Sequence, residues 1–209
     1  MSARLAGTRT GNALRINIGR KAFGTSEVLG SVVFELAPGA RIALVGPSGV
    51  GKSTLLRIVT GLDPAFEGTI ERPERIGMVF QSPTLLPWRS ALANITLATR
   101  CTSDEARERL AEVGLDTKED LFPDQLSLGQ QRRLALARAF AAAPELLVMD
   151  EPFVSLDDAL ADEMMSLTDA LITRHRAALL LVTHSAREAE RLADRTLRLS
   201  GTPASLTNA

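Results

Sequence analysis

The chain has 209 residues, of which 45% are hydrophobic and 23% charged, and its 24 basic residues nearly balance 25 acidic ones. This composition is typical of a globular domain and argues against an intrinsically disordered chain. The near-zero net charge gives no general electrostatic reason to expect nucleic acid or anionic lipid as a partner. The length predicts one domain, and we expect a flexible leader over about residues 1–14 and a small polar tail over about 200–209.

Cysteine content and apolar runs restrict the class of protein further. Cys101 is the only cysteine, so an internal disulfide is excluded and a reducing compartment is favoured. No apolar run approaches the roughly 20 residues that span a bilayer. The best candidate, residues 134–149, is interrupted by Arg138, Pro144 and Glu145. We therefore expect a cytosolic domain, whatever it docks against.

Strand and helix patterns follow one another along most of the chain. In chain order we predict strands at 32–36 and 41–45, a helix at 52–60, short strands at Ile70 and 76–80, helices at 102–113 and 127–143, a strand at 146–149, a helix at 157–173, a strand at 178–182, a helix at 185–194 and a strand at 196–199. Uninterrupted apolar strands separated by helices are typical of a parallel sheet covered on both faces. Residues 82–125 have little strand signal, and we interpret about 82–143 as a helical lobe inserted into this α/β core.

A phosphate-binding pattern follows the strand at 41–45 and opens the next helix. It reads Gly46, Pro47, Ser48, Gly49, Val50, Gly51, Lys52, Ser53 and Thr54, that is, a glycine, four residues and then Gly-Lys-Ser. Glycines let the loop turn its backbone N–H groups toward a polyphosphate, and the helix N-terminus adds positive potential. We expect Lys52 to reach the β- and γ-phosphates and the Ser53 hydroxyl to ligate Mg²⁺. The sequence therefore predicts a nucleoside triphosphate site.

Two acidic residues follow the buried strand at 146–149. Asp150 and Glu151 would emerge at the carboxyl edge of the sheet, where open parallel sheets hold ligands, and so beside the phosphate loop. We expect Asp150 to hold Mg²⁺, directly or through water, and Glu151 to polarise the attacking water. A strand that simply ends in two solvated acids is the alternative. The magnesium of a phosphate loop needs a second protein partner, which favours the functional interpretation.

Further segments, in a fixed order, indicate which phosphate-loop proteins the chain resembles. Residues 126–133, LSLGQQRR, resemble the signature motif of ATP-binding cassette (ABC) ATPases, usually Leu-Ser-Gly-Gly-Gln. Gln81 resembles the Q-loop of that family, residues 155–157 its D-loop and His184 its switch histidine. Phe23 lies where the family has an aromatic residue that stacks on adenine, which needs only a π-face. The resemblance covers about residues 15–199.

The resemblance implies a fold, a nucleotide and a set of site residues. The fold is that of an α/β P-loop NTPase with a mainly parallel central sheet, an antiparallel β subdomain and an inserted α-helical lobe, all in a single ABC ATPase domain over residues 1–209. The implied cofactors are ATP and Mg²⁺. Catalytic roles are implied for Lys52, Glu151 and His184, and metal ligation for Ser53, Gln81 and Asp150. The implied nucleotide contacts are Phe23, residues 46–54, Gln81, Ser127, Gly129, Gln130 and Asp157.

The same resemblance implies partners. Ser127 and Gly129 of one subunit would cover the ATP on the phosphate loop of a second ATPase subunit in a head-to-tail dimer, most simply a homodimer, although a heterodimer stays open. A transmembrane permease would dock near residues 82–94, where Trp88 lies beside two leucines; packing of Trp88 inside the helical lobe is the alternative. The run at 79–89 looks most like importers of the nitrate, sulfonate and taurine type.

Such an importer would place this chain as a peripheral subunit on the cytoplasmic face of the inner membrane. It would be served indirectly by an extracytoplasmic solute-binding protein, and no nucleic-acid partner is expected. Leu128 departs from the family, where glycine is usual, and its bulk predicts slower or weaker ATP-driven closure of the dimer. His175 matches no motif and is expected to be a solvated residue at a helix end.

Three other classes of function fit the sequence less well than a transporter subunit does. A non-transport ABC protein of DNA repair, translation or cofactor assembly usually has paired cassettes, coiled-coil insertions or basic arms, which this sequence lacks. A P-loop kinase or GTPase would leave residues 155–157 and His184 without a role. A catalytically weakened assembly subunit would fit Leu128, but the presence of Lys52, Glu151 and His184 argues against it.

Overall fold

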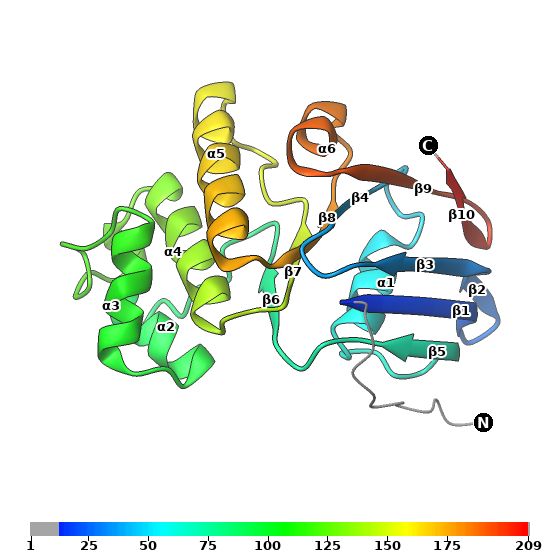
Figure 1. Cartoon of the computed structure of the whole chain (residues 1–209), viewed down its shortest axis with the longest axis horizontal. Coiled ribbons are helices and arrows are strands. Elements are labelled where there is room, and N and C mark those ends of the chain that lie inside the picture. The colour runs from blue at the N-terminus through cyan, green and yellow to red at the C-terminus, as the bar shows by residue number, and fades with distance from the viewer. Residues whose placement is uncertain (1–12, 209) are drawn as a thin grey trace.

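The computed structural model describes residues 13–208, and its elements follow the predicted alternation of strands and helices (Figure 1). They are β1 (Leu14–Phe23), β2 (Ser26–Leu29), β3 (Val32–Leu36), β4 (Arg41–Val45), α1 (Lys52–Val59), β5 (Glu67–Glu71), β6 (Ile76–Val79), α2 (Ala91–Thr99), α3 (Ser103–Glu112), the 3₁₀ helix η1 (Pro123–Gln125), α4 (Leu128–Ala141), β7 (Leu146–Asp150), α5 (Asp158–His175), β8 (Ala178–Val182), α6 (Ala186–Leu192), β9 (Arg195–Gly201) and β10 (Ala204–Asn208). Most of the expected leader lies outside the described residues.

Five parallel strands form the part of the sheet that organises the site. They run in the order β9, β4, β8, β7, β6, and each pair is parallel. The apolar residues of β7 and β8 are all buried, which explains their uninterrupted apolar sequence. Because parallel strands end at one edge, the segments that follow β4, β8, β7 and β6 lie next to one another there in that order.

The other strands form an antiparallel region, as the resemblance implied. β1 pairs antiparallel with β2, β3 and β5, and β10 links this region to the parallel strands by pairing with both β2 and β9. In the segment expected as a small polar tail, β9 extends to Gly201 and β10 follows it. The hairpin of β9 and β10 is held by backbone hydrogen bonds, so the mostly small polar side chains of β10 give no sequence pattern that indicates it. Leu14, expected at the end of the leader, is fully buried at the start of β1.

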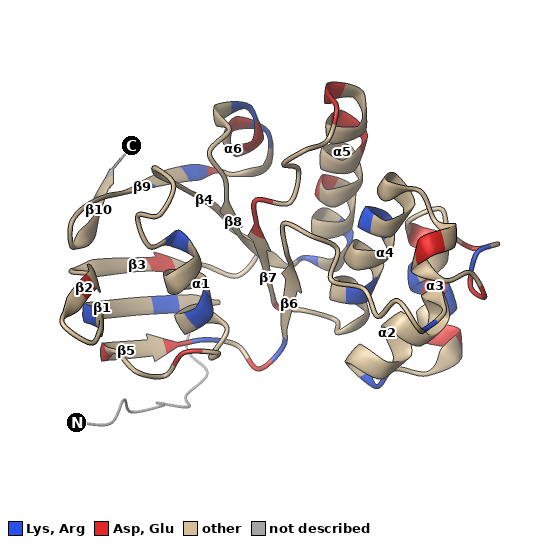
Figure 2. Ribbon diagram, turned by 180° about the vertical axis from the view of Figure 1, so that it is seen from behind, with Lys and Arg blue, Asp and Glu red and all other residues tan. Residues whose placement is uncertain are grey.

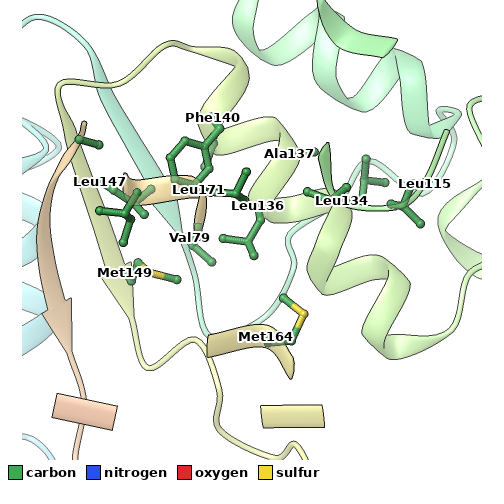
Figure 3. Close-up of a cluster of buried hydrophobic side chains, with 14 of the residues drawn as sticks. Val79, Leu115, Leu134, Leu136, Ala137, Phe140, Leu147, Met149, Met164 and Leu171 are labelled. Atoms are coloured by element: carbon green, nitrogen blue, oxygen red, sulfur yellow. The ribbon is translucent and has the colours of Figure 1, made fainter. Parts of the chain in front are cut away.

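Helices α2, α3 and α4 pack against one another beside the sheet, and α4 also contacts β6 and α5 (Figure 1). The predicted capping box at Thr102 and Glu105 is confirmed, and Ser127 and Gln130 form a second one at the start of α4. Figure 3 shows part of the apolar cluster that joins α4 to the sheet, with Phe140 of α4 in the same cluster as Leu147 of β7. Within the described residues, no helix combines the length and the apolarity that crossing a membrane requires.

The expectation of a solvated His175 is wrong. Its side chain is 18% exposed, and its ring lies 5.1 Å from that of Phe140, centroid to centroid. Its Nε2 is 3.2 Å from Oε2 of Glu112 on α3 and 3.0 Å from Arg109. These partners are more than 60 residues away in the chain, so no local pattern indicates them.

Candidate nucleotide site

The phosphate loop joins β4 to α1, as predicted, and two of its glycines are required by close packing. A Cβ atom at Gly46 would lie 2.4 Å from the carbonyl oxygen of Leu199 in β9. Gly51 has a φ of +113°, and a Cβ there would lie 2.8 Å from the Leu29 side chain of β2. The loop is therefore held against both neighbouring strands, in a shape that other residues would distort.

Lys52 lies folded over this loop. Its side chain is 6% exposed, and its Nζ donates hydrogen bonds to the carbonyl oxygens of Gly46, at 2.9 Å, and Pro47, at 3.0 Å. These two carbonyl oxygens carry no net charge, so they leave the positive charge of the ammonium able to attract a nearby anion. The Lys52 ammonium therefore lies against the phosphate loop, at its Gly46 and Pro47 carbonyls.

Glu151 lies between Lys52 and His184. Its Oε1 is 3.9 Å from the Lys52 Nζ, and its Oε2 is 3.5 Å from the His184 Nδ1. The Glu151 backbone is in the left-handed region, with φ of 45°, and its N–H donates to the Val182 carbonyl at the end of β8. Adjacent strand ends thereby bring together the three side chains to which the sequence assigned catalysis.

Asp150 ends β7 and is hydrogen bonded by the hydroxyl of Ser53. Burial raises the pKa of the Asp150 carboxyl; the bond from Ser53 and the charge of Lys52 oppose this shift, and Glu151 adds to it. A hydroxyl and a carboxylate are oxygen ligands of the kind that Mg²⁺ takes, and Mg²⁺ usually completes its shell with water and substrate phosphates. The residues present therefore fit a magnesium ion.

The remaining predicted residues lie around this centre. Gln81 is exposed just beyond β6, the strand next to β7. Phe23 is 53% exposed at the end of β1, and β2, with which it pairs, touches the phosphate loop at Gly51. Asp157 caps α5 by accepting from the Leu160 N–H at 2.9 Å. The roles of these residues toward a nucleotide stay predictions.

The signature residues, 126–133, lie at the start of α4 and not around the phosphate loop. Ser127 caps α4 and is exposed, as is Leu128 beside it, whereas the amide of Gln130 is used in the same cap. The main packing partners of α4 are α2, α3, α5 and β6, whereas α1 packs against β7 (Figure 1). The structure thus does not bring the signature segment to the phosphate loop of the same chain.

A buried pair that sequence reasoning missed supports the turn that carries His184. The Thr183 hydroxyl donates to Glu188 Oε2 at 2.5 Å and accepts from the Ser185 N–H at 3.0 Å. Thr183 and Glu188 are both buried. The spacing of an acid four residues after a histidine is too common to indicate this contact from sequence.

Glu188→Gln is expected to stabilise the chain at high pH. Burial raises the pKa of Glu188 above its ordinary 4.5; the Thr183 bond and the charge of His184 oppose this shift, and Glu151 adds to it. A raised folded-state pKa gives stability that is present below the unfolded pKa and is lost as the pH rises through the folded pKa. Melting temperatures should therefore favour the variant more at pH 8 than at pH 5. The exposed Glu190→Gln is the control, and an equal difference at both pH values would contradict the expectation.

A phosphate loop, a half-buried acidic pair and a histidine on adjacent parallel strand ends define a P-loop ATPase. Comparison with known families narrows this class. Residues 29–154 match the family described as ABC transporter, and the chain belongs to the ABC transporter family.

Relatives and a solved structure agree with this assignment. The chain is 45% identical over 196 residues to the aliphatic sulfonates import ATP-binding protein SsuB 3 of Rhodococcus jostii, covering 91% of this chain and 73% of that protein. It is 48% identical over 183 residues to the corresponding SsuB 2 protein of Rhizobium johnstonii, covering 86% and 74%. A metal-chelate type ABC transporter, solved in an inward-facing conformation, has a TM-score of 0.81 and 26% identity over 94% of this chain and 83% of its own.

Proposed function

We propose that the chain is the ATP-binding, ATP-hydrolysing subunit of an ABC importer that moves a small solute through a separate permease. The observation that carries this proposal is the Glu151 carboxylate, which lies between Lys52 and His184 beside the phosphate loop. Relatives that are 45–48% identical are named for import of aliphatic sulfonates, which supports a sulfonate as the solute class.

The proposed chemistry is transfer of the terminal phosphoryl group of ATP to water. Lys52 would offset the negative charge that develops around the γ-phosphate. Glu151 would orient the attacking water and take its proton at the carboxylate, and His184 would hold phosphate and water in register. Mg²⁺, held by Ser53 and Asp150 with Gln81 nearby, would neutralise phosphate charge. Phe23 would stack on the base, and Asp157 would be a further nucleotide contact.

The proposed active unit is a head-to-tail dimer. Because the signature segment lies away from its own phosphate loop, we propose that Ser127, Gly129 and Gln130 of one subunit cover the nucleotide of the other. ATP binding would then close the pair and hydrolysis would loosen it, which makes the protein a two-state clamp. The interpretation of residues 82–143 as a helical lobe within a single ABC ATPase domain belongs to this proposal.

The proposed permease contact is the surface at residues 82–94. The Trp88 side chain is 66% exposed, which excludes packing inside the helical lobe, and a large exposed aromatic residue suits an interface. The chain would then lie peripherally on the cytoplasmic face of the membrane, with a solute-binding protein acting on the far side.

Light scattering on the Glu151→Gln variant, with and without Mg-ATP, tests the proposal. Loss of the carboxylate should lower hydrolysis by about 10²–10⁴-fold while ATP binding is kept. We expect a monomer that becomes a dimer only with ATP, whereas the wild type should return to monomer as ATP is consumed. Absence of ATP binding in both proteins would overturn the proposed function.

Replacing Leu128 by Gly should speed hydrolysis. The Leu128 side chain is 47% exposed at the first position of α4, where it would lie against the nucleotide of a second subunit. Removing this bulk should raise the rate by roughly two- to tenfold, equivalent to about 0.4–1.4 kcal/mol. Steady-state hydrolysis measures this, and an unchanged rate would contradict it. A silent wild type with an active Leu128→Gly variant would instead favour the catalytically weakened subunit.

A further inference from the structure

Arg132 of α4 is a buried cation that is 6% exposed. Within residues 13–208 no acidic side chain forms an ion pair with it. Its guanidinium donates to three backbone carbonyls, those of Gln81, of Pro152 at 3.1 Å and of Val154 at 3.4 Å. Its Nε has no hydrogen-bond partner among the residues that the structure describes. A buried charge is costly, so the carbonyls that it collects are the contacts that compensate for its burial.

These carbonyls belong to two segments of the candidate site. Gln81 follows β6, and residues 152–154 directly follow Glu151. Two residues in the left-handed region flank residues 152–154, Glu151 with φ of 45° and Ser155 with φ of 66°. Non-glycine residues rarely adopt this conformation, and surrounding contacts must maintain it. Arg132 supplies such contacts, because it donates to carbonyls of residues 152–154 and also to the carbonyl of Gln81.

A second arginine of α4 strengthens the attachment on the Gln81 side. Arg138 donates to the Pro83 carbonyl at 2.9 Å, to the Thr84 carbonyl at 2.9 Å and to the Thr84 hydroxyl at 3.0 Å. Thr84 is also left-handed, with φ of 47°. Two arginines therefore hold residues 81–84 on α4, but only Arg132 also reaches the segment after Glu151.

We propose that Arg132 is a positioning residue that couples the start of α4 to Gln81 and Glu151 at once. Ser127 lies five residues before Arg132, so a shift of α4 on contact with a second subunit would move both catalytic segments through one side chain. The inference rests on the proposed function, because Glu151 and Gln81 matter only if the site hydrolyses ATP.

The test compares Arg132→Met with Arg133→Met in the full-length chain. Arg133 is the adjacent arginine of the same helix, and it donates to the Val113 carbonyl at 2.6 Å and pairs with Glu163, away from both segments. For Arg132→Met we expect kcat to fall by roughly 10- to 100-fold, with KM for ATP within about threefold, because misplaced catalytic groups cost rate more than binding. Amide hydrogen exchange should speed up over residues 81–84 and 151–155 in this variant and not in Arg133→Met.

Two further variants keep the result interpretable. Arg132→Lys, which can reach fewer carbonyls, should give an intermediate kcat, and Arg132→Gln replaces Arg132→Met if the latter fails to fold. Wild-type kcat together with wild-type exchange over both segments would overturn the inference. So would faster exchange along all of α4, since that would indicate a merely structural role. If the wild type itself hydrolyses no ATP, the proposed function fails, while the exchange measurement still decides whether Arg132 holds both segments.

Discussion

Lys52→Met should lower ATP hydrolysis by about 10²–10³-fold and weaken nucleotide binding. The Lys52 ammonium is 6% exposed and is bonded to the Gly46 and Pro47 carbonyls, so it is held where the phosphates of a bound nucleotide would lie. Methionine has a side chain of similar length, but it has neither the positive charge nor the N–H donors of the ammonium group. Steady-state hydrolysis and titration with a fluorescent ATP analogue measure the two effects.

The matched control is Lys118→Met. The chain has only three lysines, and Lys118 lies between α3 and η1, away from the phosphate loop. This variant should hydrolyse ATP as the wild type does. Hydrolysis by Lys52→Met within about threefold of the wild type would contradict the assignment of the phosphate loop, since the loss of a charged donor in a working site costs far more.

Phe140→Ala should destabilise the chain by about 3–5 kcal/mol, the usual cost of emptying a large buried aromatic site. Phe140 is 2% exposed, in the cluster that joins α4 to the sheet and α5, and its ring lies 5.1 Å from that of His175 (Figure 3). For a chain of this size the melting temperature should fall by roughly 6–20 °C. Thermal unfolding followed by circular dichroism measures the shift.

Phe122→Ala is the control for this loss. Its side chain is 41% exposed, so the change should alter the free energy of unfolding by no more than about 0.5 kcal/mol. Similar shifts for both variants would mean that the contact between α4 and the sheet contributes little to stability. The packing of α4 against the sheet also matters for function, because α4 contains Arg132 and begins at Ser127.

Charged side chains on helices and strands do not by themselves reveal the site. Figure 2 shows basic and acidic residues distributed over the sheet and the helices alike. What distinguishes Lys52, Asp150 and Glu151 is their position at one edge of the sheet, where the order of the parallel strands brings the buried lysine beside two half-buried carboxylates. A search for charge alone would have missed them, whereas the strand order places them.

The sequence alone determined the phosphate loop, the acidic pair at the end of β7 and the parallel sheet. Each depends on a contiguous pattern, such as the apolar run before Asp150, and contiguous patterns report burial directly. The alternation of Leu14, Ile16 and Ile18 with polar residues is likewise typical of the half-buried strand β1. A short strand of small residues such as β10 leaves no such signal.

Only the tertiary structure decided which distant residues meet. Glu151 lies between Lys52 and His184, Trp88 points to the surface and Arg132 joins two loops, and none of these follows from local periodicity. The physical reason is that backbone pairing between strands and packing between helices set these contacts. Periodicity tells which face of an element is buried, but the partner that covers this face comes from elsewhere in the chain.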